Sequence, residues 1–336
     1  MFWRWIWING TTGRLRSGWR AVFFCCIYFT FRQMTTQQHG GSTAPLPMEP
    51  VQYVFGILYY GFISLVFISI SLWLLRSLDG LPPVTFGLPF RWREAAKAGR
   101  GAALGFLCIL LCLLGLAAGG FVQFHWRPHG LDSLVNSAII LGLLFTYAAF
   151  ETIVFRGYLL QTLLRGAGIL GALAVSALFY AVNLTVLYLD NPAFSSTFTP
   201  LAFINLFLIS FVLGLLYLRA GSLWWVIGMS TGWQFCLSFF NLPGNDEFIG
   251  HLPLSATTAG AVWLTGGAMG PEGGLVVSGI LLLLAGILTH GRYGLSLQSA
   301  WWEWREYLAT RRILPWDFTV DGRQYQWKIL VKENTE

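Results

Sequence analysis

The chain has few charged residues: they make up 11% of its 336 residues, whereas a soluble domain carries about 25%. Apolar residues account for 55%. So few charges cannot cover the surface of a soluble protein of this length, so the sequence predicts contact with a lipid bilayer. The net charge of +6 comes from short basic clusters between apolar runs. This pattern is typical of membrane topology, and no nucleic-acid partner is expected.

Cysteine and histidine are also scarce, with five residues of each. The cysteines lie inside apolar runs, at spacings typical of neither metal sites nor disulfide frameworks. The histidines fall in loops or at the ends of apolar runs; they are His39, His125, His129, His251 and His290. We therefore expect no metal ion and no cofactor. The sequence also lacks an obvious internal repeat, which disfavours an inverted-repeat transporter.

Long apolar runs are abundant, and a membrane helix needs about 20 such residues. Candidate spans are 18–34, 51–75, 101–121, 134–164, 167–188, 199–218, 222–241 and 273–290. The sequence thus predicts an all-α fold, a polytopic transmembrane helix bundle of about eight spans with a short soluble C-terminal tail. Arginines before the first run are reminiscent of a signal peptide, but no clear cleavage site follows, so we expect an uncleaved span.

The distribution of lysine and arginine predicts the orientation of these spans. Basic residues gather in the N-terminal arm, in loop 76–100, at Arg165 and Arg219, and in the C-terminal tail. The alternate loops contain one basic residue, Arg127; these loops are 35–50, 122–133, 189–198 and 242–272. Because basic loops favour the cytoplasm, we expect both termini to be cytoplasmic, in what we take to be a bacterial cytoplasmic membrane.

We expect three regions along the chain. Residues 1–79 form an N-terminal arm with two leading helices, and residues 80–290 form a core of six membrane helices. Residues 291–336 form a cytoplasmic tail, in which 299–313 suits an amphipathic interfacial helix and 318–327 suits a small hairpin.

Polar residues inside the spans indicate a site. Ionisable groups at bilayer depth are costly and therefore suggest function, and this applies to Glu151 and Arg156. Asn183, Ser230 and Gln234 lie on later spans, and a helix rise of ~1.5 Å per residue places them at a depth similar to that of Glu151. Three spans would therefore bring polar groups together within a bundle. Interhelical hydrogen bonding is the alternative for the three uncharged residues.

These residues resemble the motifs of the CAAX-protease and bacteriocin-processing (CPBP) family of intramembrane peptidases. The segment 151–157 resembles the motif EExxxR, 179–183 resembles FxxxH, and 230–234 resembles HxxxN. The Gly-rich segment 264–274 is similar to one found in a bacterial branch of the family. The resemblance runs from about residue 80 to 290. It implies peptide hydrolysis inside the membrane by water that a glutamate activates.

Carried over by position, the resemblance makes Glu151 the general base and residue 183 its histidine partner. Residues 230 and 234 would stabilise the oxyanion, and residue 152 would be the glutamate that pairs with Arg156. This chain departs from the family at four of these positions, which hold Thr152, Asn183, Ser230 and Gln234. Glu151 lies about 140° around an α-helix from Arg156, so it is poorly placed to pair with it.

The departures affect the expected chemistry. Asn183 cannot exchange a proton, and without a cationic neighbour a buried Glu151 tends to be neutral and cannot activate water. We therefore expect the peptidase scaffold with weak, altered or no hydrolytic activity.

Other functions stay open at this point. The chain could bind a membrane peptide or protein without cleaving it, as in bacteriocin immunity, or use Glu151 as the proton site of a transporter. A rhomboid-type serine mechanism is disfavoured because no histidine in the membrane can activate Ser230. The Gly-rich segment 264–274 follows no predicted strand, so we interpret it as close helix packing and not as a phosphate loop.

Overall fold

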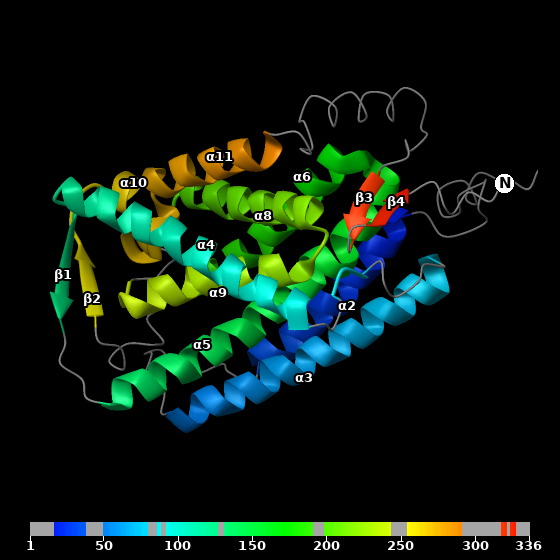
Figure 1. Ribbon diagram of the computed structural model, residues 1–336, viewed down its shortest axis with the longest axis horizontal. Helices are drawn as coiled ribbons and strands as arrows, with labels where there is room; N and C mark the ends of the chain where they lie inside the picture. Colours follow the sequence, from blue (N-terminus) through cyan, green and yellow to red (C-terminus); the bar gives the residue numbers. More distant parts are fainter. Residues whose placement is uncertain are drawn as a thin grey trace, which may run out of the picture.

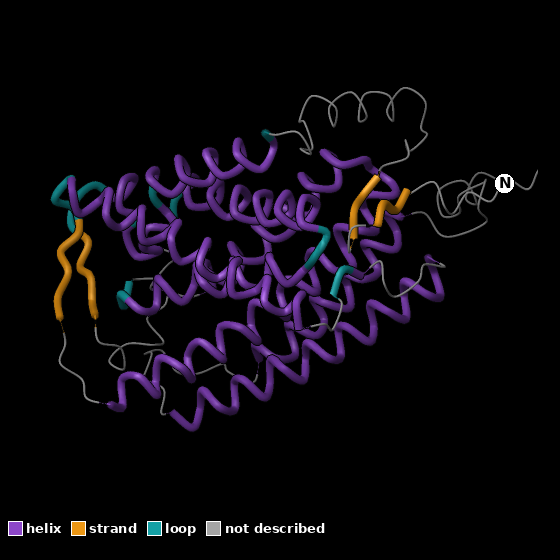
Figure 2. Tube along the Cα trace, viewed as in Figure 1, coloured by secondary structure: helices purple, strands orange, loops and turns teal. Residues whose placement is uncertain are grey.

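The computed structural model describes residues 17–37, 50–79, 86–88, 92–126, 131–190, 198–242, 254–290, 317–320 and 323–326. Helices dominate these residues and run broadly along one axis, with a small two-stranded sheet across one end of the bundle (Figures 1 and 2). This arrangement confirms the predicted all-α membrane fold. The predicted interfacial helix at 299–313 lies outside the described residues.

Each of the eight predicted apolar runs coincides with helical structure. The main helices are α2 (Ser17–Gln37), α3 (Pro50–Leu74), α4 (Trp92–Ala118), α5 (Leu131–Thr152), α6 (Leu160–Asp190), α8 (Pro200–Ala220), α9 (Leu223–Phe239) and α11 (Leu275–Thr289). Shorter helical segments are η1 (Leu75–Asp79), η3 (Ile153–Leu159), α10 (Val262–Thr265) and η5 (Gly267–Gly273). The long predicted run 134–164 therefore contains α5, η3 and the start of α6, and α6 is interrupted at Gly168, which has a φ of 68°.

By length and composition, five helical stretches in the described part of the chain can cross a membrane. They are Val51–Leu78, Trp92–Ala118, Val135–Leu164, Ala167–Leu189 and Pro200–Ala220. The apolar helix α11 is shorter, so the count of eight spans stays a prediction. Large apolar side chains cover the outside of the bundle; on α3, for example, Phe55, Phe62 and Trp73 are each more than 60% exposed. Such a surface suits lipid.

Helices α4 and α9 pack against each other more extensively than any other pair. Glycines on both helices allow this close approach. A Cβ atom at Gly101 or Gly105 of α4 would lie 2.3 Å or less from a backbone oxygen of α9. A Cβ atom at Gly228 or Gly232 of α9 would lie 2.0 Å or less from a backbone oxygen of α4. Reciprocal small residues at a spacing of four are typical of tightly packed membrane helices.

The start of α4 differs from the sequence prediction. The apolar run predicted a helix from residue 101, and 76–100 was predicted as a loop. The helix begins at Trp92, because its first turns are amphipathic: Glu94 is buried, and Lys97 binds it at 2.6 Å. The second half of the predicted loop is therefore helical.

Two small sheets accompany the helices. Strands β1 (Val122–Trp126) and β2 (Leu254–Thr258) pair antiparallel at one end of the bundle, which the sequence analysis did not predict. They join two of the predicted loops that are poor in basic residues, 122–133 and 242–272. Strands β3 (Asp317–Val320) and β4 (Arg323–Gln326) also pair antiparallel, so the predicted hairpin near 318–327 is present.

Candidate functional site

Glu151 lies at the end of α5 and is 4% exposed. Two tyrosine hydroxyl groups donate hydrogen bonds to its carboxyl group. Tyr147, one turn earlier on α5, reaches Oε1 at 2.9 Å, and Tyr180 of α6 reaches Oε2 at 3.3 Å. Burial favours the neutral form of Glu151, whereas the hydrogen bonds from both tyrosines favour its carboxylate. Neither tyrosine was expected from the sequence, although the spacing of four between Tyr147 and Glu151 places them on one helix face.

The chain directly after Thr152 forms a π-helical segment, η3, whose seven residues are all buried. Short π-helical segments inside α-helices occur frequently at functional sites. The carbonyl oxygen of Phe155 accepts the backbone N–H of Leu160, and Ser176 of α6 also donates to it at 3.1 Å. This segment directs Arg156 into the bundle.

Arg156 is 1% exposed, and its Nη2 donates to the Ser210 hydroxyl group of α8 at 2.9 Å. Its guanidinium carbon also lies 4.7 Å from the centre of the Tyr180 ring, within the range of a cation–π contact. Tyr180 therefore contacts Arg156 through its ring and Glu151 through its hydroxyl group. Thr152 is fully buried, and its hydroxyl group has no hydrogen-bond partner among the described residues.

Asn183, at the position of the motif histidine, is 2% exposed. Arg32 of α2 binds it: Nη1 donates to the backbone carbonyl oxygen at 2.8 Å and also to the side-chain oxygen. The side chain of Asn183 thus contacts a cation and is not bonded to Glu151. No role was expected for Arg32, which lies near the end of the first predicted span, 18–34, and reaches the site through the packing of α2 on α6.

Ser230 and Gln234 are half-buried on α9, one helical turn apart. Helix α9 packs on α5, which carries Glu151 and its hydrogen-bond donor Tyr147. The structure thus joins Glu151 and Arg156 through Tyr180 and brings Asn183 to a neighbouring arginine.

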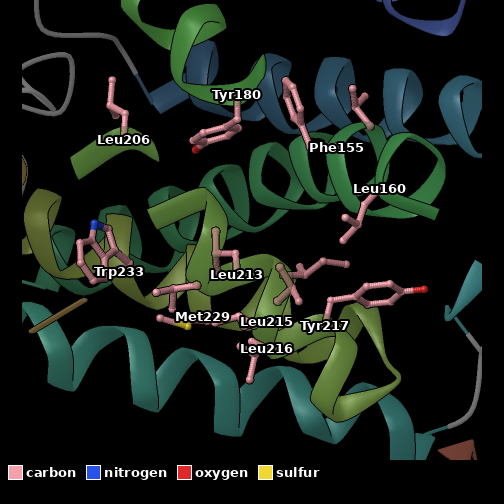
Figure 3. Packing of buried hydrophobic residues seen from close by; sticks show 14 of the residues in the cluster. Phe155, Leu160, Tyr180, Leu206, Leu213, Leu215, Leu216, Tyr217, Met229 and Trp233 are labelled. Carbon is pink, nitrogen blue, oxygen red and sulfur yellow. The ribbon is translucent and has the colours of Figure 1, made fainter. Parts of the chain in front are cut away.

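A second acid, Glu272, is half-buried in the Gly-rich segment η5, outside the predicted spans. Its Oε1 accepts a hydrogen bond of 2.5 Å from Nε1 of Trp233, which stands between Ser230 and Gln234 on α9. Figure 3 shows Trp233 and Tyr180 among the buried side chains around this region. Glu272 interacts electrostatically with both Glu151 and Tyr180. No role was expected for Glu272, because the pattern of segment 264–274 indicates only close packing of small residues.

The environment of Glu272 favours its neutral form. Burial raises the pKa of its carboxyl group to about 7; the hydrogen bond from Trp233 lowers it, and the nearby carboxyl group of Glu151 raises it further. Near neutral pH, Glu272 can therefore hold or release a proton, which is the property of a general acid or base.

Together, the fold and site define a membrane-embedded helix bundle with a buried, hydrogen-bonded acid. Residues 133–236 match the model of the family described as "Type II CAAX prenyl endopeptidase Rce1-like". This match confirms the predicted resemblance for the segment from α5 to α9, which contains all six predicted site residues. Arg32 and Glu272 lie outside the matched segment. No curated protein and no solved structure matches the chain.

Proposed function

We propose that this CAAX-protease-like membrane protein is an intramembrane endopeptidase with an altered and slow mechanism, in which Glu151 activates water against a membrane-bound peptide or protein. The observation that supports this most directly is the environment of Glu151. Its carboxyl group is buried, accepts two tyrosine hydroxyl groups, and lies within the segment that matches the family.

The proposed reaction is hydrolysis of a peptide bond. Glu151, as a carboxylate, takes one proton from water while the water oxygen bonds to the carbonyl carbon of the substrate. Ser230 and Gln234 can donate hydrogen bonds to the oxyanion that forms, as such donors do in other acyl-transfer enzymes. The C–N bond then breaks, and the proton moves from Glu151 to the leaving nitrogen.

The expected reaction is slow because two parts of the family site are replaced. Asn183 cannot share a proton with Glu151, and the hydroxyl of Ser230 is a weaker donor than a charged imidazole. The two tyrosines and Arg156 compensate in part, since they favour the ionised form of Glu151. A general acid or base contributes about 10² to 10⁴ in rate, which bounds the loss from a missing histidine.

Cleavage of a peptide library by protein in lipid nanodiscs tests the proposal. We expect slow cleavage by the wild type and a decrease of at least ~100-fold for Glu151→Gln, which keeps the shape but cannot take a proton. Glu94→Gln is the matched control, because Glu94 is also buried but binds Lys97 in the first turns of α4. Equal rates for the wild type and Glu151→Gln, or no cleavage by either, would contradict the proposal.

One observation favours a second candidate, a non-catalytic protein that binds a membrane peptide. Arg32 of α2 donates hydrogen bonds to the backbone and side-chain oxygens of Asn183. In the family motif, a histidine stands at this position. In that case the wild type would cleave nothing, and a membrane peptide would co-purify with it and be lost from the Glu151→Gln variant.

A further inference from the structure

The reaction above assigns no role to Glu272, which is bound to Trp233 of α9. We propose that Glu272 is a second catalytic carboxyl group, which acts as the general acid opposite Glu151 and replaces the proton donor lost with the motif histidines. This inference rests on the proposed function, because it assigns a role within the same hydrolytic site.

The position of Glu272 is fixed from several sides. Trp233 holds its carboxyl group, and Asn205 of α8 holds its backbone by donating to the carbonyl oxygens of Glu272 and Gly274 at 2.7 and 2.9 Å. Ser278 of α11 in turn donates to the Asn205 side-chain oxygen at 2.6 Å. Three helices therefore fix a loop residue, which is the kind of support that a catalytic side chain needs.

The glycines of the segment make this placement possible. Gly266 has a φ of 83°, and a Cβ atom there would lie 1.6 Å from the carbonyl oxygen of Gly270. Only glycine allows a turn this tight, because any side chain would collide with the backbone. The turn folds η5 back against α8, and the carboxyl group of Glu272 thereby reaches Trp233 of α9.

Glu272 is also suitably located relative to the other acid. It interacts electrostatically with Glu151 and with Tyr180, and Tyr180 donates directly to Glu151. The donor that orients Glu272 belongs to α9, the helix that carries Ser230 and Gln234. The side chain is half-buried, so part of it stays accessible to a substrate.

Two carboxyl groups in different protonation states can complete hydrolysis without a histidine, as paired carboxyl groups do in other enzymes. Glu151 takes a proton from water as the water oxygen bonds to the carbonyl carbon, and protonated Glu272 gives its proton to the carbonyl oxygen. Glu151 then gives its proton to the nitrogen as the C–N bond breaks, and Glu272 recovers a proton from one hydroxyl group. The products are a carboxylic acid and an amine, and both acids return to their starting states.

The pH dependence of peptide cleavage in nanodiscs tests this role. The titratable groups that interact with Glu272 among the described residues are Glu151 and Tyr180. Because Glu272 must be protonated, we expect kcat of the wild type to fall as the pH rises above about 7. Glu272→Gln should lower kcat by ~100-fold and remove this alkaline decrease, whereas Glu272→Asp should keep the decrease and recover part of the rate.

Controls separate this inference from the proposed function. Trp233→Phe keeps the acid but removes its hydrogen bond, so it should shift the alkaline decrease without abolishing cleavage, even if Glu272→Gln fails to fold. Glu94→Gln should behave as the wild type. If Glu151→Gln is inactive while Glu272→Gln keeps the wild-type rate and pH profile, Glu272 has no catalytic role and the proposed function stands. If the wild type itself cleaves nothing, both are wrong.

Discussion

At the scale of single residues, the main difference from the family motifs lies at Asn183. An arginine contacts this residue where the motif has a histidine, so a fixed positive charge stands beside the position of a titratable group. The guanidinium group of Arg32 supports an ionised Glu151 electrostatically. The same charge would disfavour a second cation at residue 183.

Restoring the motif histidine tests this interpretation. We expect Asn183→His alone to raise kcat by less than ~10-fold, because Arg32 disfavours a protonated imidazole next to it. The double variant Asn183→His with Arg32→Gln should gain ~100-fold or more, since the histidine can then exchange a proton. The measurement is peptide cleavage in nanodiscs, with Asn183→Gln as a control that keeps an amide. A full gain from the single variant would show that Arg32 does not suppress a histidine.

The sequence predicted part of the site and missed part of it for a physical reason. Glu151 and Arg156 can be recognised from the sequence alone, because a charged residue inside an apolar run is energetically costly. Tyr180 and Glu272 do not stand out in that way: a tyrosine is ordinary in a membrane helix, and Glu272 lies in a glycine-rich loop. Their proximity to Glu151 depends on how α6 and η5 pack, which one sequence does not reveal.

At the scale of elements, the contact between α4 and α9 holds the predicted oxyanion helix in place. Gly228 and Gly232 flank Ser230 on α9, and they face α4 at backbone contact distance. These two glycines therefore fix how closely the helix that carries Ser230 and Gln234 approaches α4. The sequence predicted both helices, but their pairing became visible only from the reciprocal glycine contacts.

Two alanine substitutions on α4 test this contact. Gly105→Ala places a Cβ atom 2.1 Å from the Met229 carbonyl oxygen, so the helices must separate, and we expect a loss of about 1 to 3 kcal/mol in stability. Gly115→Ala is the matched control, because nothing lies within 4 Å of its Cβ position on the same helix. It should leave the Tm unchanged or raise it slightly, since alanine favours helix. The test is thermal unfolding in detergent, and equal Tm values for the two variants would contradict the close contact.

At the scale of the whole molecule, the small sheet at one end supports the predicted topology. The loops 122–133 and 242–272 are separated by four predicted spans, so they should emerge on the same side of the membrane. Strands β1 and β2 lie in these two loops and pair directly, which requires that the loops share one end of the bundle. Helix α4 leads into β1, and exposed tryptophans lie near its two ends: Trp92 at its start and Trp126 in β1, as is typical of membrane interfaces.

The basic clusters then predict which end faces the cytoplasm. Arg93 lies in the first turn of α4, in a basic region expected to be cytoplasmic, and Trp126 lies beyond its other end, in a loop expected outside. A membrane-impermeant maleimide applied to intact cells should therefore label Trp126→Cys, and it should label Arg93→Cys only after permeabilisation. The unsubstituted chain is the control, because its five cysteines lie in apolar runs. The reverse labelling pattern would show that the orientation is opposite to the predicted one. Labelling of both variants in intact cells would show that α4 does not span the membrane.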